Sequence, residues 1–500
     1  MEEVRLVHNR RSRRPGGEDF PMRRPVLCVL SSLLALVLAA ADAAAQTAAR
    51  PNIILIVADD LGYGELGSYG QTIIQTPHLD ALAAQGIRFT QFYAGSTVCA
   101  PSRSVLMTGQ HVGHTRVRGN AGSENYASQT LAATDVTVAR VLQQAGYSTA
   151  LIGKWGLGET GSEGEPNRHG FDDFYGFINQ AHAHNHYPDF LWRNREKIAL
   201  ANVVTPVGTT PGAGYATRRV QYAGDLFFDE ARAFIQRSKD RPFFLELALT
   251  VPHANNERAR ALGDGQEVPD YGPYASKDWP APLKGQAAMI TRMDRKIGEL
   301  IAQLKQLGID DRTLVIFTSD NGPHKEGGGA FDPEFFNANG PFSGIKRSLT
   351  DGGIRVPFLA RWPGKIKAGR TSAQVGYFGD MMATLCELAG ATRPPAALDS
   401  LSLVPTLVGL GTQASHEYLY WEFYEGGFSQ AVLLGGRWKG IRLKSPAAAM
   451  QLFDLAGDAS ETADLAGGQP DLVRRIEAIM RDAHVDNAYW KWPAAAPITP

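Results

Sequence analysis

Two short acidic segments contain residues that could hold a metal ion. Asp59 and Asp60 stand side by side, and Asp320 is followed by Asn321. These residues offer three carboxylates and one amide carbonyl, the hard oxygen ligands that Ca²⁺ or Mg²⁺ prefers. Taken singly, each pair is more often a helix cap or an ordinary turn, so the metal prediction depends on the rest of the sequence.

A third segment joins a cysteine to an arginine at a fixed spacing. It begins at Cys99, reads Cys-Ala-Pro-Ser-Arg, and continues through a short apolar stretch to a Thr-Gly pair. Gly-Lys-Trp follows at 153–155 and Thr-Ser-Asp-Asn-Gly at 318–322. In these motifs and their order the sequence resembles the type I sulfatases, the formylglycine-dependent arylsulfatase family of the alkaline phosphatase superfamily. The resemblance runs from Pro51 to the C-terminus.

The resemblance implies that Cys99 is oxidised to formylglycine, by a formylglycine-generating enzyme or an anaerobic maturation enzyme. The aldehyde would hydrate to a gem-diol. Comparison with a serine nucleophile explains why the reaction needs a gem-diol. A serine could attack sulfur, but its sulfate ester would then require a second attack at a hindered, anionic centre. In a gem-diol, one hydroxyl attacks and the other later loses its proton, which expels sulfate by carbon–oxygen cleavage.

The same resemblance implies a role for each matching residue. Arg103 would hold the gem-diol and offset the carboxylates, one helical turn from residue 99. Lys154 and Lys346 would bind sulfate oxygens, and His253 would protonate the leaving oxygen or bind sulfate. A divalent cation, Ca²⁺ or alternatively Mg²⁺, would lower the pKa of the attacking hydroxyl. The implied metal ligands are Asp59, Asp60, the modified Cys99, Asp320 and Asn321.

Two positions depart from the family pattern. Gln110 stands where the signature often ends in Arg, but it lies outside the oxidation core, so we expect the modification to survive. The other departure concerns a histidine. The family commonly has Lys-Trp-His, whose histidine assists proton transfer from the gem-diol, but the third residue here is Gly156. Its replacement could be His111 or His114, or a later cluster of three alternating histidines. We favour the first two members of the cluster as a substrate-binding wall, with a solvated loop or a zinc site as alternatives. The cluster consists of His182, His184 and His186.

The elements that must position these residues have the pattern of an alternating α/β protein. Short continuous apolar runs are typical of strands buried on both faces, and segments with helical spacing lie between them. We predict a large α/β domain with a central mixed, mostly parallel sheet flanked by helices, and a ligand site at the carboxyl ends of its strands. The predicted strands are 53–57, 148–152, 243–249, 313–318 and 356–360, and two predicted helices are 77–85 and 287–307.

The last part of the chain has a different pattern of apolar and polar residues. From about Ser415 the sequence turns to short amphipathic strand runs, with a helix near 471–483. We predict a small C-terminal α+β domain with an antiparallel sheet, in which Trp421 is core rather than a sugar platform. The predicted domain organisation is a leader at 1–45, a catalytic domain at 50–410 and a C-terminal domain at 415–500.

The first 45 residues have the features of an export signal. Arg23 and Arg24 precede an apolar run, 26–41, and small residues at 43–45 follow it. The run is short for a membrane span, so we predict a cleaved signal peptide and no stable span, with an uncleaved anchor as the alternative. The mature protein would be periplasmic or secreted, and Met22 is a candidate for the true start.

The overall charge and the number of cysteines make some classes of protein unlikely matches for this chain. The 500 residues contain 50 Lys+Arg against 51 Asp+Glu, so nothing favours nucleic-acid binding, and three cysteines are too few for a disulfide framework. The leading interpretation is a sulfate-ester hydrolase for a sulfated small molecule or oligosaccharide, either a sulfated carbohydrate or an aryl sulfate. The alternatives are a phosphodiester or phosphonate monoester hydrolase of the same superfamily, and a catalytically silent protein that binds sulfated glycans.

Overall fold

The computed structural model describes residues 50–120, 126–395 and 399–493. The predicted export signal lies outside these residues. Within them, none of the helices combines the length and apolar character that crossing a membrane requires.

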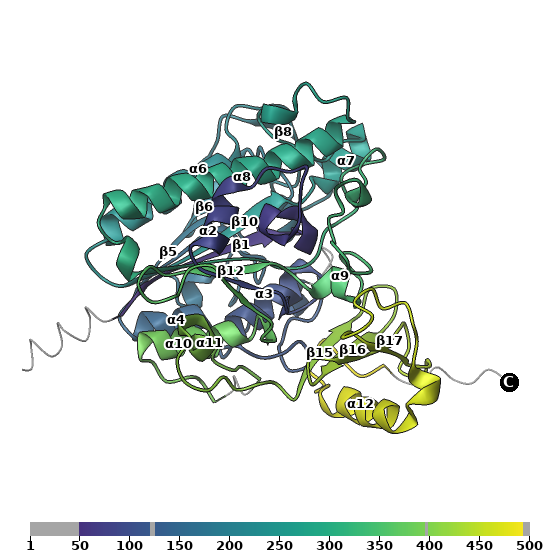
Figure 1. Ribbon diagram of the computed structural model, residues 1–500. Helices are drawn as coiled ribbons and strands as arrows, with labels where there is room; N and C mark the ends of the chain where they lie inside the picture. Colours follow the sequence, from purple (N-terminus) through teal and green to yellow (C-terminus); the bar gives the residue numbers. More distant parts are fainter. Residues whose placement is uncertain (1–49, 121–125, 396–398, 494–500) are drawn as a thin grey trace, which may run out of the picture. The chain divides into compact units, whose positions relative to one another are not determined.

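A ten-stranded sheet lies at the centre of the α/β part (Figure 1). Its five middle strands run parallel, and antiparallel pairings flank them on both sides, so the predicted mixed and mostly parallel sheet is confirmed. In spatial order the strands are β13 (Arg370–Ser372), β2 (Ile87–Phe89), β12 (Phe358–Arg361), β11 (Thr313–Ser319), β1 (Asn52–Asp59), β10 (Phe243–Pro252), β4 (Ser148–Lys154), β5 (Asp173–Phe177), β6 (Phe190–Arg193) and β7 (Glu196–Ala199).

The sequence of β1 explains its central position. Its side chains alternate between two separate hydrophobic clusters, one on each face of the sheet: Ile53, Leu55 and Val57 in one, Ile54, Ile56 and Ala58 in the other. Because both faces are covered, every position of the strand can be apolar. The run therefore ends only where the strand leaves the core, at Asp59.

Helices cover both faces of the sheet (Figure 1). One face carries α2 (Pro77–Ala84), α6 (Ala223–Ser238) and α8 (Ala281–Gln306), and the other α3 (Cys99–Thr108), α4 (Val138–Gln144), α10 (Asp380–Ala389) and α11 (Val404–Val408). The predicted helix at 287–307 begins earlier than expected, at Ala281. Pro282 stands in its first turn, where a missing backbone N–H costs nothing.

Several short elements were not predicted. The strands β5, β6 and β7, at one side of the sheet, are too short to give a clear apolar pattern. The connection before α6 contains a hairpin of β8 (Val203–Pro206) and β9 (Gly214–Arg218). The remaining small elements are the paired strands β3 (Phe92–Tyr93) and β14 (Gly376–Tyr377), and the helices α5 (Gln180–Ala183), α7 (Asn256–Leu262) and α9 (Asp351–Ile354).

The C-terminal region contains the predicted antiparallel sheet. Its four strands follow chain order, and α12 (Pro470–Asp482) packs on them through Ile476 and Met480. Trp421 is buried, and its Nε1 donates to the Ala94 carbonyl at 3.0 Å, so it belongs to the core. The domain boundaries themselves stay a prediction. The strands are β15 (Tyr418–Phe423), β16 (Ser429–Leu434), β17 (Trp438–Arg442) and β18 (Gln451–Asp454).

Candidate active site

Polar residues gather at the carboxyl ends of four neighbouring parallel strands. Asp59 is the last residue of β1, and Asp60 follows it. Lys154 ends β4, His253 comes directly after β10, and Asp320 directly after β11. Because parallel strands end at the same edge of a sheet, residues far apart in the sequence meet there.

The turn after β1 holds Asp60 in an unusual conformation. Its φ is +64°, which few residues other than glycine adopt. The Asp60 N–H donates to Asp320 Oδ1 at 3.1 Å, and Asn321 Nδ2 donates to Asp60 Oδ1 at 2.7 Å. The surrounding hydrogen bonds thus hold a strained residue in place and direct its carboxylate into the site.

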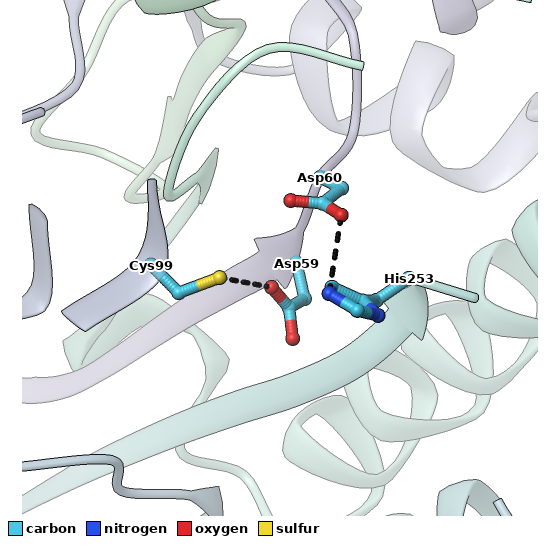
Figure 2. Close-up of side chains that lie close together, drawn as sticks. All are labelled: Asp59, Asp60, Cys99 and His253. Atoms are coloured by element: carbon cyan, nitrogen blue, oxygen red, sulfur yellow. Dashed lines mark hydrogen bonds and ion pairs between the residues drawn. The ribbon is translucent and has the colours of Figure 1, made fainter. Parts of the chain in front are cut away.

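Helix α3 brings two further predicted residues to this edge. Cys99 is its first residue, and Cys99 Sγ lies 3.4 Å from Asp59 Oδ1. Figure 2 shows Cys99 and His253 directed toward the neighbouring carboxylates Asp59 and Asp60. One turn further on, Arg103 donates to Asp320 Oδ2 from Nε at 3.0 Å and from Nη2 at 2.7 Å. Arg103 therefore links the helix to the metal-ligand candidates as expected for its spacing.

Two lysines complete the charge balance of the site. Lys154 Nζ lies 2.7 Å from Asp59 Oδ2, and Lys346 Nζ lies 2.8 Å from Asp60 Oδ2. Lys346 Nζ also lies 3.0 Å from His253 Nε2. All of these side chains are buried, so each charge depends on its partners rather than on water.

Burial and these ion pairs set the protonation states. Burial raises the pKa of the Cys99 thiol, and the nearby Asp59 charge raises it further, so the sulfur is a neutral thiol at neutral pH. Burial together with the charge of Asp59 raises the pKa of Asp320 to about 7. Burial opposes ionisation of Asp59, but Lys154 and its cationic neighbours outweigh it and hold the Asp59 pKa well below its usual range.

The donor set fits a hard divalent cation. Asp59, Asp60 and Asp320 are buried carboxylates at neighbouring strand ends, and Asn321 Oδ1 is buried without a hydrogen-bond partner among the described residues. One ligand atom from each of Asp59, Asp60, Cys99 and His253 lies within 4.8 Å of the others. Oxygen donors of this kind suit Ca²⁺ or Mg²⁺ rather than a soft metal.

The ring of His253 is oriented by the backbone. Its Nδ1–H donates to the Ala254 carbonyl at 2.6 Å, which leaves Nε2 facing the site, 3.4 Å from Asp60 Oδ2. Sequence reasoning missed Glu326, whose Oε2 lies 2.9 Å from Lys346 Nζ and 3.6 Å from His253 Nε2. The one available signal was its position in the Gly-rich connection that follows Asp320.

The histidine cluster divides between two environments. His184 lines the cavity that contains Cys99; its ring stacks on His253 at 4.8 Å between centroids, and Nδ1 lies 3.1 Å from Glu257 Oε2. His182, expected on the same wall, is instead buried against Phe177 and Phe190. Residues two apart on a helix point in different directions, and this segment is the helical turn α5 rather than an alternating strand.

The other histidines considered lie elsewhere. His111 and His114 stack on each other and contact Asp399 beside Tyr377, and neither is among the residues that line the Cys99 cavity. His186 is buried, with Nε2 donating to the His253 carbonyl at 2.8 Å. In the described part of the chain, the three alternating histidines do not come together as a metal-binding group.

The site opens into a cavity of about 530 Å³. Cys99, His253 and Lys346 line it together with mostly polar side chains. Among those polar residues are Asn179, Gln180, His184, Glu257, Arg260 and Arg347. A polar ligand carrying an anionic group would find hydrogen-bond partners throughout this space.

Sequence comparison agrees with this geometry. The sulfatase family profile matches residues 51–391, which is more than half of the chain. The chain belongs to the sulfatase family. A second profile, described as N-sulphoglucosamine sulphohydrolase, C-terminal, matches residues 342–483 of this sulfatase.

Individual relatives support the same assignment. The sulfatase is 32% identical to steryl-sulfatase of Mus musculus, an alignment covering 83% of this chain and 74% of the relative. It is 33% identical to N-acetylgalactosamine-6-sulfatase of Canis lupus familiaris, covering 82% of this chain and 76% of the relative. Membership of this family places the chain among the sulfuric ester hydrolases.

Solved structures show the same fold. One neighbour comes from work on glycosaminoglycan metabolism by Bacteroides thetaiotaomicron, with a TM-score of 0.72, 27% identity, and coverage of 87% of this sulfatase and 99% of that chain. Another is Ps i-CgsB in complex with k-i-k-neocarrahexaose, with a TM-score of 0.70, 26% identity, and coverage of 89% and 95%.

Proposed function

We propose that this sulfatase releases sulfate from a sulfated carbohydrate, using a formylglycine formed from Cys99 and a hard divalent cation. The observation that carries the proposal is that Cys99, which lines the cavity, lies in one network of contacts with three buried carboxylates and three buried cations. The cations are Arg103, Lys154 and Lys346. Such a site offers positive charge to a sulfate group and oxygen ligands to a metal.

Two groups would be added to the chain before it acts. The hydrated formylglycine would supply one hydroxyl to attack sulfur and a second whose deprotonation would let sulfate leave from carbon. Asp59, Asp60, Asp320 and Asn321 would hold the cation, which would supply positive charge that lowers the pKa of the attacking hydroxyl. Its chemical preference is for Ca²⁺ or Mg²⁺.

The protein's own residues bind and orient the ester. Lys154 and Lys346 have ammonium groups beside Asp59 and Asp60, where they can turn to sulfate oxygens. His253 presents Nε2 to the same space, and burial together with the Lys346 charge lowers the pKa of its ring, so Nε2 holds no proton at rest. A proton that Nε2 takes from the Lys346 ammonium, 3.0 Å away, can pass on to the leaving alcohol oxygen as the sulfur–oxygen bond breaks. Burial keeps water away from these groups and strengthens each interaction with the developing charge.

The cavity favours a carbohydrate over an apolar alcohol. Its walls carry His184 with Glu257, and Asn179 and Arg260, groups that can bond sugar hydroxyls. A sterol would bring no hydrogen-bonding groups to this wall, and each polar group that it covered and left unpaired would cost about 1–3 kcal/mol. The neighbouring structure of Ps i-CgsB with a bound neocarrahexaose adds support for a sulfated oligosaccharide substrate. His184 is the substrate contact that we assign from the histidine cluster.

The location and maturation of the protein belong to the same proposal. Residues 1–45 would direct export to the periplasm or beyond, and a maturation enzyme would oxidise Cys99. N-terminal sequencing of the protein purified from its native host tests the first point. An N-terminus at Met1 or Met22 would contradict cleavage near residue 45.

The decisive experiment combines mass spectrometry with substrate screening. The full chain is produced with and without a formylglycine-generating enzyme, and the mass of the tryptic peptide containing residue 99 is measured. We expect the aldehyde form only with the enzyme, and free sulfate from sulfated mono- or disaccharides only in that preparation. Unmodified Cys99 in the matured preparation would refute the catalytic proposal and favour a silent glycan-binding protein.

A second comparison separates the two hydrolase classes. Rates are measured on a sulfate monoester and on a phosphodiester with the same leaving group. A sulfatase should favour the sulfate ester, and the reverse preference would reassign the protein to the phosphodiester or phosphonate monoester hydrolases.

A further inference from the structure

The loop after β4 leaves a position without a side chain next to the active site. Gly156 has φ of +74°, a left-handed conformation that favours glycine. A Cβ atom built on Gly156 would lie 2.3 Å from Gln180 Nε2 and 2.9 Å from Gln180 Cδ. The amide of Gln180 therefore occupies the space into which a side chain at residue 156 would extend.

Local hydrogen bonds hold the two residues next to each other. The Gly156 N–H donates to the Ile178 carbonyl at 3.0 Å, and Gln129 Nε2 donates to the Gly156 carbonyl at 2.9 Å. Gln180 is the first residue of α5, and the side chain of Asn179 caps that helix by accepting from Ala181 N–H at 2.8 Å. The backbone positions of Gly156 and Gln180 are thus fixed by the fold.

The amide of Gln180 has the features of a ligand-binding group. Its Nε2 is buried and has no hydrogen-bond partner among the described residues. Gln180 lines the same cavity as Cys99, His184 and Lys346. Leaving a buried N–H unpaired costs about 1–3 kcal/mol, so a partner supplied by the substrate would recover that cost.

We propose that Gln180 is a positioning residue of the active site, whose Nε2–H donates to a sulfate oxygen or to the oxygen carried by residue 99. The inference rests on the proposed function of Cys99. Because a carboxamide donates hydrogen bonds but does not take up a proton near neutral pH, Gln180 supplies orientation at this position and no acid–base step. In this chain the orienting group beside Gly156 comes from α5 instead of from the loop that follows Lys154.

Removal of the amide is the first test. In the matured enzyme, Gln180→Ala should lower kcat on p-nitrophenyl sulfate about a hundredfold, as for loss of one preorganised donor, with formylglycine and metal contents unchanged. Gln236→Ala, at an exposed position on α6, is the control and should behave as the unsubstituted protein. Equal kcat for Gln180→Ala and the control would overturn the proposal.

A charge-switch variant distinguishes hydrogen bonding from a structural role. Gln180→Glu keeps the shape of the side chain, but its carboxylate repels sulfate when ionised and donates a hydrogen bond when protonated. We expect its activity relative to the unsubstituted enzyme to rise as the pH is lowered from 8 to 5. A loss that is the same at every pH would indicate damage to the loop and would count against the proposal.

The shared space gives a third test. Gly156→His alone should lose activity, because its Cβ overlaps the Gln180 amide, and the pair Gly156→His with Gln180→Ala should recover part of it. Histidine is among the residues that tolerate a positive φ better than most. Identical activity for the single and double variants would show that the two side chains do not compete for one space.

The binding of inorganic sulfate can be measured without turnover, so it tests the role of Gln180 independently of the proposed function. Calorimetry on the Cys99→Ala protein needs no turnover, and adding Gln180→Ala should weaken sulfate binding about tenfold. If that weakening is seen while the unsubstituted protein releases no sulfate from esters, the proposed function fails and the role of Gln180 in anion binding stands. If turnover is normal and neither kcat nor sulfate binding depends on Gln180, this inference alone fails.

Discussion

Cys99 is buried at the start of α3, 3.4 Å from a carboxylate oxygen of Asp59. Burial and that charge raise the pKa of its thiol, so a thiolate does not form near neutral pH. Without modification, residue 99 is therefore a poor sulfur nucleophile in this environment.

Replacing Cys99 by serine exchanges one sulfur atom for oxygen and tests whether Cys99 is the source of the nucleophile. Cys99→Ser cannot form the aldehyde, so steady-state release of sulfate should fall by about a thousandfold or more. If the serine hydroxyl still attacks, intact-mass measurement should find a protein carrying one sulfuryl group. Turnover equal to that of the unsubstituted enzyme would refute Cys99 as the source of the nucleophile.

Asp320 accepts hydrogen bonds from Arg103 and from the Asp60 N–H, and it is a ligand of the proposed metal. Asp320→Ala should lower metal content and activity together, because it removes one of three carboxylates and leaves the Arg103 charge buried without its closest partner. We expect a stability loss of about 3–5 kcal/mol, measured by thermal unfolding beside metal analysis. Asp320→Asn, which keeps the shape, separates loss of charge from loss of packing, and full metal content in both variants would contradict the assignment.

At the scale of single elements, the parallel strands determine where the chemistry lies. β1, β4, β10 and β11 each end at a polar residue of the site, because the core covers them on both faces until that point. β10 also carries an exception within its apolar run, Glu246, whose side chain shares a face with Phe244 and Ala248. Burial raises the pKa of Glu246 to about 7.

The carboxyl group of Glu246 should make stability depend on pH. Its folded pKa lies above the ordinary value of 4.5, so the folded state favours the protonated form and that stabilisation is lost as the pH rises through about 7. Glu246→Gln imitates the protonated form, so at pH 8 it should be more stable than the unsubstituted protein, by up to about 3 kcal/mol.

Chemical denaturation at pH 5 and pH 8 checks this expectation. The advantage of Glu246→Gln should shrink to about 1 kcal/mol or less at pH 5, where the folded state holds a neutral carboxyl and only the unfolded chain is partly ionised. Glu387→Gln, at an exposed position of α10, is the control and should show no such pH dependence. A variant less stable than the unsubstituted protein at pH 8 would contradict the raised pKa.

At the scale of the whole molecule, the C-terminal sheet supports the loop that carries Lys346. Lys439 on β17 is fully buried, and its Nζ lies 2.6 Å from Asp351 Oδ1 and 2.9 Å from Glu461 Oε1. Asp351 begins α9, shortly after Lys346 in the chain. An ion pair outside the active site therefore fixes the end of an active-site loop.

Lys439→Ala should weaken both the fold and the site. It leaves two buried carboxylates without their shared cation, which should cost about 3–5 kcal/mol in thermal unfolding experiments. Activity measured below the melting temperature should also fall, because the Lys346 loop loses its support. Lys367→Ala, at an exposed position, is the control, and equal melting temperatures for the two variants would refute the linkage.

Much of the site was readable from the sequence because its residues stand at the ends of apolar runs or inside short motifs. Asp59 and Asp320 are examples of the first case, and Cys99 with Arg103 of the second. The exact ends of the strands were less readable. β10 continues three residues beyond the predicted 249, to Pro252, which brings His253 to the strand end.

The sequence by itself determined the chemical groups available, namely the oxygen ligands, the cysteine in its motif and the alternation of strands and helices, since these depend on residue type and local spacing. Only the tertiary structure decided that His184 reaches the cavity while His182 is buried, and that Gln180 fills the space beside Gly156. Those outcomes depend on contacts between segments far apart in the chain, and local spacing contains no information about such contacts.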